Sequence, residues 1–187
     1  MSNQDWRDKN GVKKPPPPPK TRIGKRHSAY ALVWWGELGK ILLVKEEGSQ
    51  FWGLPGGELQ SDESHEKAVI RETLEETGFS IVITHERKQP IWKQSGCLFS
   101  EKRGYVRTDI RIFSGKKGSG FQEIRPIQPD LMVPHTRHVV RWVSIRHLVA
   151  MVENDTLHPL FHNFIRHEFM EEEIGQVTDI ERSVALA

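Results

Sequence analysis

The chain has 187 residues, enough for one domain with a real hydrophobic core and too few to favour two. Its single cysteine, Cys97, excludes an intramolecular disulfide and a multi-cysteine zinc site. The sequence has neither an apolar signal region at its start nor a run of ~18 apolar residues. We therefore expect no membrane span and predict a cytoplasmic protein.

Charge is divided unequally along the chain. Met1–Arg26 contains eight of the 27 Lys and Arg residues but only two of the 25 Asp and Glu residues. The remaining 19 basic and 23 acidic residues make His27–Ala187 mildly acidic, although the whole chain has a formal net charge of +2. An acidic domain needs a bound metal ion or local Lys and Arg side chains to hold a phosphate.

The first 25 residues are predicted to be a disordered, basic, proline-rich arm. Pro15–Pro19 imposes polyproline II geometry and excludes a helix or a sheet interior. Such an arm is a solvated leader, and the alternatives are a ligand for a proline-recognising groove or a contact to RNA. Residues 26–187 are predicted to form the folded domain.

Strand patterns come first in this domain. His27–Trp35 and Ile41–Lys45 are rich in β-branched and apolar residues, and the glycine-bearing loop between them predicts a hairpin. Phe51–Gly57 predicts a short strand that breaks into a glycine loop. Ser61–Thr77 contains neither Gly nor Pro and is followed by Gly78, which predicts a helix with a left-handed C-terminal cap. Three residues are candidates for its N-cap: Ser61, Asp62 and Ser64.

Strands and then helices complete the chain. Phe79–Thr84, a stretch near Val106–Phe113 and Val139–Ser144 are predicted strands, and Ile145–Val152 and Leu157–Glu172 are predicted helices. Strands that alternate with helices in this order predict a layered α/β sandwich with a mixed sheet.

Three carboxylates gather on one face of the predicted central helix. With ~100° between successive residues, Glu72, Glu75 and Glu76 fall within an arc of roughly 100°. Ile70 and Leu74 fall on the opposite side, where we expect them to enter a core. Carboxylates this close repel one another, and a hard divalent cation such as Mg²⁺ removes the repulsion.

The loop before the helix supports this interpretation. Gly56 and Gly57 allow the backbone to approach a ligand where any Cβ would obstruct it. The glycines and the three carboxylates together predict a site for a metal ion and a phosphate. Glu-x-x-Glu-Glu alone is also compatible with an ordinary solvated helix face, stabilised by pairs such as Arg71–Glu75.

The full spacing from Gly57 to Phe79 resembles the Nudix box, G-x5-E-x7-R-E-U-x-E-E-x-G-U, in which U is a bulky aliphatic residue. Thr73 stands where an aliphatic residue is usual, and Phe79 is aromatic. Trp52–Gly56 is similar to the family's lead-in to the box. The following residues occupy their places in the box: Gly57, Glu63, Arg71, Glu72, Glu75, Glu76, Gly78 and Phe79.

The resemblance implies a Nudix-type α/β/α sandwich with a mixed β-sheet. It also implies a Mg²⁺-dependent pyrophosphohydrolase that cleaves the diphosphate linkage of a nucleoside diphosphate derivative, with Mn²⁺ as a substitute metal. By similarity, the metal ligands are Glu72, Glu75, Glu76 and the Gly56 carbonyl. Glu63 and Arg71 orient these ligands and complete the catalytic set.

Several points stay open. The general base is Glu72 or a carboxylate outside the box, for which Glu123 and Asp130 are candidates. The substrate is a nucleotide, a dinucleoside polyphosphate, a nucleotide sugar or an RNA 5′ end, and a homodimer is compatible with the sequence. Alternating Arg107, Asp109 and Arg111 indicate one face of a strand. The competing hypothesis for the whole domain is a catalytically silent module that binds nucleotides.

Overall fold

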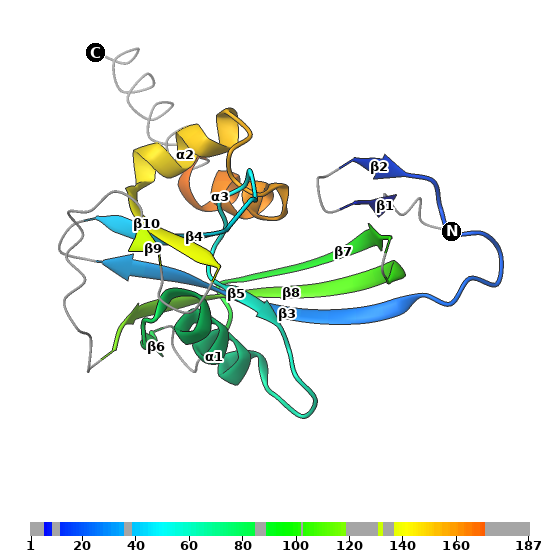
Figure 1. The fold of residues 1–187 in the computed structure, drawn as a ribbon, viewed down its shortest axis with the longest axis horizontal. Helices are drawn as coiled ribbons and strands as arrows, with labels where there is room; N and C mark the ends of the chain where they lie inside the picture. Colours follow the sequence, from blue (N-terminus) through cyan, green and yellow to red (C-terminus); the bar gives the residue numbers. More distant parts are fainter. Residues whose placement is uncertain are drawn as a thin grey trace, which may run out of the picture.

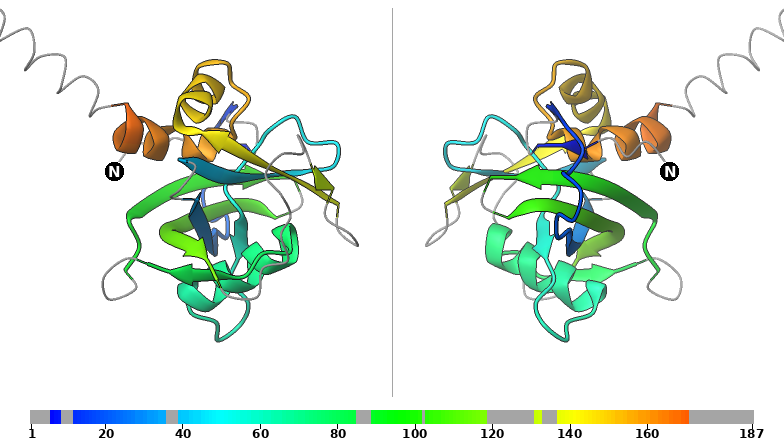
Figure 2. Two further views of the ribbon diagram at one scale, coloured as in Figure 1. Left: turned by 90° about the vertical axis from the view of Figure 1, so that its left-hand side faces the viewer. Right: turned by 90° about the vertical axis from the view of Figure 1, so that its right-hand side faces the viewer.

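The computed structural model describes the following residues: 6–8, 12–35, 39–84, 89–101, 103–118, 131–132 and 137–170. They form a mixed, strongly curled β-sheet between two helical layers (Figure 1). Helix α1 (His65–Thr77) covers one face, and α2 (Ile145–Glu153) and α3 (His162–Phe169) cover the other. Figure 2 shows the same layers from two sides. The expected α/β/α sandwich with a mixed sheet is confirmed.

The sheet runs in the order β2-β1-β7-β8-β3-β4-β10-β9, while β5 pairs with β3 and β6 with β8. The β3–β8 and β1–β7 pairs are parallel, and the remaining pairs are antiparallel. The strands have these bounds: β1 Trp6–Arg7, β2 Lys13–Lys14, β3 Gly24–Trp35, β4 Lys40–Glu46, β5 Gly56–Glu58, β6 Ile81–Ile83, β7 Trp92–Ser100, β8 Gly104–Lys117, β9 Leu131–Met132 and β10 His138–Ser144.

Strand β3 is buried on both faces and connects two cores. Ala29, Ala31 and Val33 belong to the core beneath α1. Leu32 belongs to the core on the other face, where it joins Leu148 of α2 and side chains of α3. Successive residues of a strand point to opposite faces, so one strand positions both helical layers.

Helix α1 begins at His65, four residues after the predicted start. Of the three candidate caps, Ser64 is the N-cap, and its hydroxyl accepts a hydrogen bond from the Lys67 N–H at 3.3 Å. Gly78 ends the helix in the left-handed region, with φ 71°, and donates its N–H to the Leu74 carbonyl. The predicted C-terminal cap is therefore confirmed.

The core-facing side of α1 differs from the prediction. Ile70 and Leu74 are 38% and 50% exposed, whereas Val69, Thr73 and Thr77 are buried. The helix packs on the sheet next to its carboxylate face and not opposite to it, which turns Ile70 and Leu74 to solvent. Thr73 satisfies its buried hydroxyl by donating to the Val69 carbonyl at 2.7 Å, so a threonine is tolerated at this position of the box.

Two other predictions need correction. Strand β7 was not predicted, because its sequence mixes polar and apolar residues, yet it pairs with β8 along its whole length.

The helix expected over Leu157–Glu172 is divided into a 3₁₀ turn, Pro159–Phe161, and α3. A proline at the start and the His158 ring, which accepts the Leu160 N–H at 3.1 Å, favour this short turn.

The described part of the N-terminal segment pairs with the sheet, which differs from the solvated arm expected from its composition. Trp6 of β1 pairs in parallel with Cys97 of β7 and is only 2% exposed. Its ring meets Tyr105 edge to face, with the centroids 5.0 Å apart. Burial of the tryptophan ring and the pairing of β1 with β7 together favour docking of a segment that its composition alone assigns to solvent. In the described part of the chain, no helix is long and apolar enough to span a membrane.

Removing the Trp6 ring is expected to detach β1 and β2 without unfolding the domain, because β1 and β2 lie at the end of the sheet order. We expect trypsin to cleave after Arg7 and Lys13 at least ~10-fold faster in Trp6→Ala, with little change in the melting temperature. Val12→Ala, at a side chain that is 54% exposed, is the matched control. Equal cleavage rates in the wild type and Trp6→Ala would contradict docking of β1.

Candidate active site

The carboxylate face of α1 lies against β5, which pairs with β3. The Gly56 N–H donates to Glu76 Oε2 at 2.8 Å, so the end of the glycine loop is bonded directly to the helix. The second oxygen, Glu76 Oε1, lies 3.7 Å from His138 Nε2 on β10. The structure thus joins Gly56 to Glu76 and places His138 beside the same carboxylate.

Arg71 connects the acidic residues around it. Its guanidinium donates to both oxygens of Glu63, from Nε at 2.9 Å and from Nη2 at 2.8 Å. Nη1 donates to Glu72 Oε1 at 2.8 Å and to Glu75 Oε2 at 3.1 Å. Hydrogen bonds to Arg71 lower the pKa of Glu63, and the paired carboxylates raise the pKa of Arg71. A lysine could not reproduce this planar, bidentate arrangement.

The two glycines are required for different reasons. A Cβ on Gly57 would lie 2.6 Å from Glu72 Cδ, so Gly57 leaves the space that the Glu72 carboxylate occupies. Gly56 has φ +143°, and a Cβ there would overlap the backbone carbonyl of Ala29 and the Cα of Tyr30. Gly57 therefore accommodates the site, whereas Gly56 accommodates the pairing of β5 with β3.

Glu76 is the carboxylate with the most perturbed protonation. Burial, together with the neighbouring Glu72, Glu46 and Glu75, raises its pKa to about 8, and the hydrogen bond from the Gly56 N–H opposes the shift. Its side chain is 17% exposed. Arg71 compensates Glu72 and Glu75, but among the described residues no guanidinium bonds to Glu76. A negative charge at this position therefore lacks an adequate counter-charge.

Substituting the two glycines separates the site from the fold. We expect Gly57→Ala to fold with a melting temperature close to that of the wild type, because the Glu72 carboxylate is the end of a flexible side chain and can move away. Hydrolysis should fall by ~10²-fold or more, since Glu72 is displaced. Gly56→Ala should instead lower the melting temperature by about 4 °C or more, through backbone overlap. An active Gly57→Ala enzyme would contradict the proposed position of Glu72.

The raised pKa of Glu76 predicts how stability depends on pH when a chelator removes divalent cations. Between about pH 5 and pH 8 the folded state keeps a proton that the unfolded state has lost, so stability falls as the pH rises. Glu76→Gln stays neutral and should melt about 4 °C or more above the wild type at pH 9, with little difference at pH 5. Thermal melts across this range, with Glu66→Gln as the control, test the prediction; parallel curves would contradict it.

The other residues that the sequence suggested as site candidates contribute less to the candidate active site. Glu123 and Asp130, the candidate carboxylates outside the box, lie outside the described residues. Trp52 is buried and packs beneath Lys45, whose Nζ lies 5.0 Å from the ring centroid, so this tryptophan belongs to the core and not to a base-stacking surface. Arg103 pairs with Glu58 Oε2 at the end of β5.

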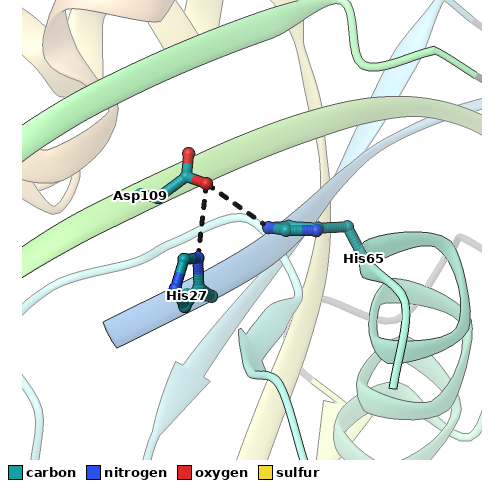
Figure 3. A group of neighbouring side chains, drawn as sticks. All are labelled: His27, His65 and Asp109. Carbon is teal, nitrogen blue, oxygen red and sulfur yellow. Dashed lines mark hydrogen bonds and ion pairs between the residues drawn. The ribbon is translucent and has the colours of Figure 1, made fainter. Parts of the chain in front are cut away.

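A second polar cluster was not visible in the sequence. His27 of β3, His65 of α1 and Asp109 of β8 point toward one another (Figure 3). Burial lowers the pKa of His65. The three residues are far apart in the chain, and only the parallel pairing of His27 with Asp109 and the docking of α1 bring them together. The alternating charged residues of β8 predicted that Asp109 lies on one face of a strand. They did not predict that His27 and His65 lie beside it.

Comparison with known proteins agrees with the geometry. Residues 25–164 match the family model described as the NUDIX domain. Because this match spans most of the chain, the protein belongs to the Nudix family.

Two relatives and two solved structures illustrate the similarity. The chain is 31% identical over 116 residues to a putative 8-oxo-dGTP diphosphatase of Bacillus subtilis (60% of this chain, 75% of the relative). It is 39% identical over 129 residues to phosphatase NudJ of Escherichia coli (67% and 72%). A NUDIX hydrolase from Nitrosomonas europaea superimposes with a TM-score of 0.56 at 20% identity (79% and 90% coverage). The MutT protein from Methanosarcina mazei Go1 gives 0.56 at 24% identity (82% and 99%).

The names of these relatives and the family match confirm the predicted class of enzyme, a Nudix pyrophosphohydrolase. The two structural likenesses, both below 25% identity, establish the shared fold. Nudix hydrolases generally use divalent metal ions, so the acidic face of α1 is where the family's chemistry has to be sought.

Proposed function

We propose that the protein is a Mg²⁺-dependent pyrophosphohydrolase that cleaves the diphosphate linkage of a nucleoside diphosphate derivative. The observation that carries this proposal is the carboxylate cluster of Glu72, Glu75 and Glu76 beside the Gly56–Gly57 loop. The Glu72 carboxylate occupies the space that Gly57 leaves, and the buried Glu76 has no guanidinium partner among the described residues.

The donor set fits a hard divalent cation. Carboxylate oxygens and a backbone carbonyl are the ligands that Mg²⁺ and Mn²⁺ take in proteins, and Glu72, Glu75, Glu76 and the Gly56 carbonyl would supply them. A cation would also favour the ionised form of Glu76, which burial otherwise disfavours. When bound, Mg²⁺ would offset the diphosphate charge and lower the pKa of an attacking water.

The chain's own residues hold this arrangement in place. Arg71 fixes Glu72 through Nη1 and is itself fixed by both oxygens of Glu63, so Glu63 and Arg71 act as positioning residues. The Gly56 N–H orients Glu76. Glu72 remains a candidate general base within the box, with Glu123 and Asp130 as candidates outside it.

The substrate is proposed to be of the nucleotide type, which the names of the diphosphatase relatives support. A panel of 8-oxo-dGTP and other nucleoside triphosphates, dinucleoside polyphosphates, nucleotide sugars and 5′-triphosphorylated RNA tests the proposal. Identifying the products shows which phosphorus is attacked. We expect Mg²⁺-dependent hydrolysis of at least one of these substrate classes. Binding without turnover across the panel would favour the silent nucleotide-binding module.

Glu76→Gln is expected to lower turnover by ~10²-fold or more on any substrate found, because the neutral amide removes an anionic metal ligand. Folding should be retained, since the amide oxygen can still accept the Gly56 N–H. Steady-state rates at several Mg²⁺ concentrations provide the measurement. Glu66→Gln, in the first turn of the same helix, is the matched control. Near-normal turnover in Glu76→Gln would refute the metal assignment.

A further inference from the structure

We propose a second metal site, separate from the carboxylate cluster, in which His27, His65 and Asp109 bind a transition metal ion of the Zn²⁺ type. Figure 3 shows the three side chains converging from β3, the first residue of α1 and β8. One ligand atom from each lies within 4.8 Å of the other two.

The two distances to Asp109 are close to those of tetrahedral coordination. Ligands bound to Zn²⁺ at ~2.0–2.1 Å with tetrahedral angles lie about 3.3–3.4 Å apart. His27 Nδ1 lies 3.3 Å from Asp109 Oδ2, and His65 Nε2 lies 3.8 Å from the same oxygen. A shift of ~0.5 Å in the His65 ring would bring its Nε2 to the tetrahedral ligand spacing from Asp109 Oδ2. Three protein ligands leave a fourth position for water.

His65 provides an independent reason to expect a ligand. Its side chain is 15% exposed, and its Nε2 is buried with no hydrogen-bond partner among the described residues. A buried, unpartnered ring nitrogen is costly, and it faces the two other donors. A metal ion at the centre of the cluster would satisfy it.

Arg111 also acts on this cluster. Its Nη2 donates to Asp109 Oδ2 at 3.2 Å, and its positive charge opposes a nearby cation. Carboxylates that bind metals generally accept hydrogen bonds from neighbouring groups, so Arg111 is placed to orient Asp109. For Oδ2 to bind a metal, the Arg111 hydrogen bond has to shift within the carboxylate.

The donors distinguish this site from the proposed Mg²⁺ site on the same helix. Two imidazoles and one carboxylate favour Zn²⁺, Co²⁺ or Ni²⁺ and disfavour Mg²⁺, which prefers oxygen ligands. A metal here would link the first residue of α1 to two strands of the sheet, and thus tie down the N-terminal end of the helix that carries the box.

The test is calorimetric titration of the chelator-treated, full-length protein with Zn²⁺, with millimolar Mg²⁺ present to occupy the carboxylate cluster. We expect one Zn²⁺ to bind the wild type, with affinity lowered by ~10-fold or more in His27→Ala and in His65→Ala. His147→Ala, at an exposed histidine of α2, is the matched control and should bind as the wild type does. Co²⁺ should give a tetrahedral absorption spectrum that both cluster variants lose.

Glu76→Gln separates the two metal sites. This variant should keep its Zn²⁺ affinity while losing Mg²⁺-dependent hydrolysis, so failure of one proposal leaves the other intact. The second site is refuted if the wild type does not bind Zn²⁺, or if His27→Ala and His65→Ala bind it as tightly as His147→Ala. Loss of Zn²⁺ binding in Glu76→Gln alone would place the ion in the carboxylate cluster and would likewise refute the second site.

Discussion

The arrangement of the site depends on the hydrogen bonds of Arg71. One guanidinium faces Glu63, Glu72 and Glu75, and its five N–H groups are shared among them and the Glu58 carbonyl. Without this cation, the repulsion between adjacent carboxylates would oppose the helical geometry that brings them together. Glu76 accepts the Gly56 N–H and lies 3.7 Å from His138 Nε2 but has no guanidinium partner among the described residues, so its charge is the one that a divalent ion is best placed to compensate.

Strand β3 fixes the distance between helix α1 and the Gly56–Gly57 loop. Helix α1 packs on Ala29 and Ala31 of β3, and β5 pairs with the same strand. The helix and the glycine loop are thus positioned from one element, and the separation between Gly57 and Glu72 follows from core packing. Since protein cores are close-packed and tolerate little displacement, the carboxylates are held by side chains that take no part in the chemistry.

The features predicted from the sequence are local ones. The box, the C-terminal cap at Gly78 and the carboxylate face depend on spacings within a single helix, which helical geometry fixes. Features that depend on strand pairing were missed: β7, the docking of Trp6, and the meeting of His27 with Asp109. The exposed positions of Ile70 and Leu74 were missed because periodicity defines a helix face but does not say which face the sheet covers.

Helix α1 presents two kinds of donor atom at its two ends, and the difference in donors would allow the two proposed sites to coexist. Near its C-terminal end it offers carboxylate oxygens beside a backbone loop, a set suited to an ion that keeps several waters and shares phosphate oxygens. At its first residue it offers an imidazole to two strands, a set suited to an ion held by the protein. Since Mg²⁺ disfavours imidazole and Zn²⁺ favours it, each ion prefers a different end. Selectivity would follow from ligand chemistry, and one helix would carry both proposed sites, with His65 about two turns before Glu72.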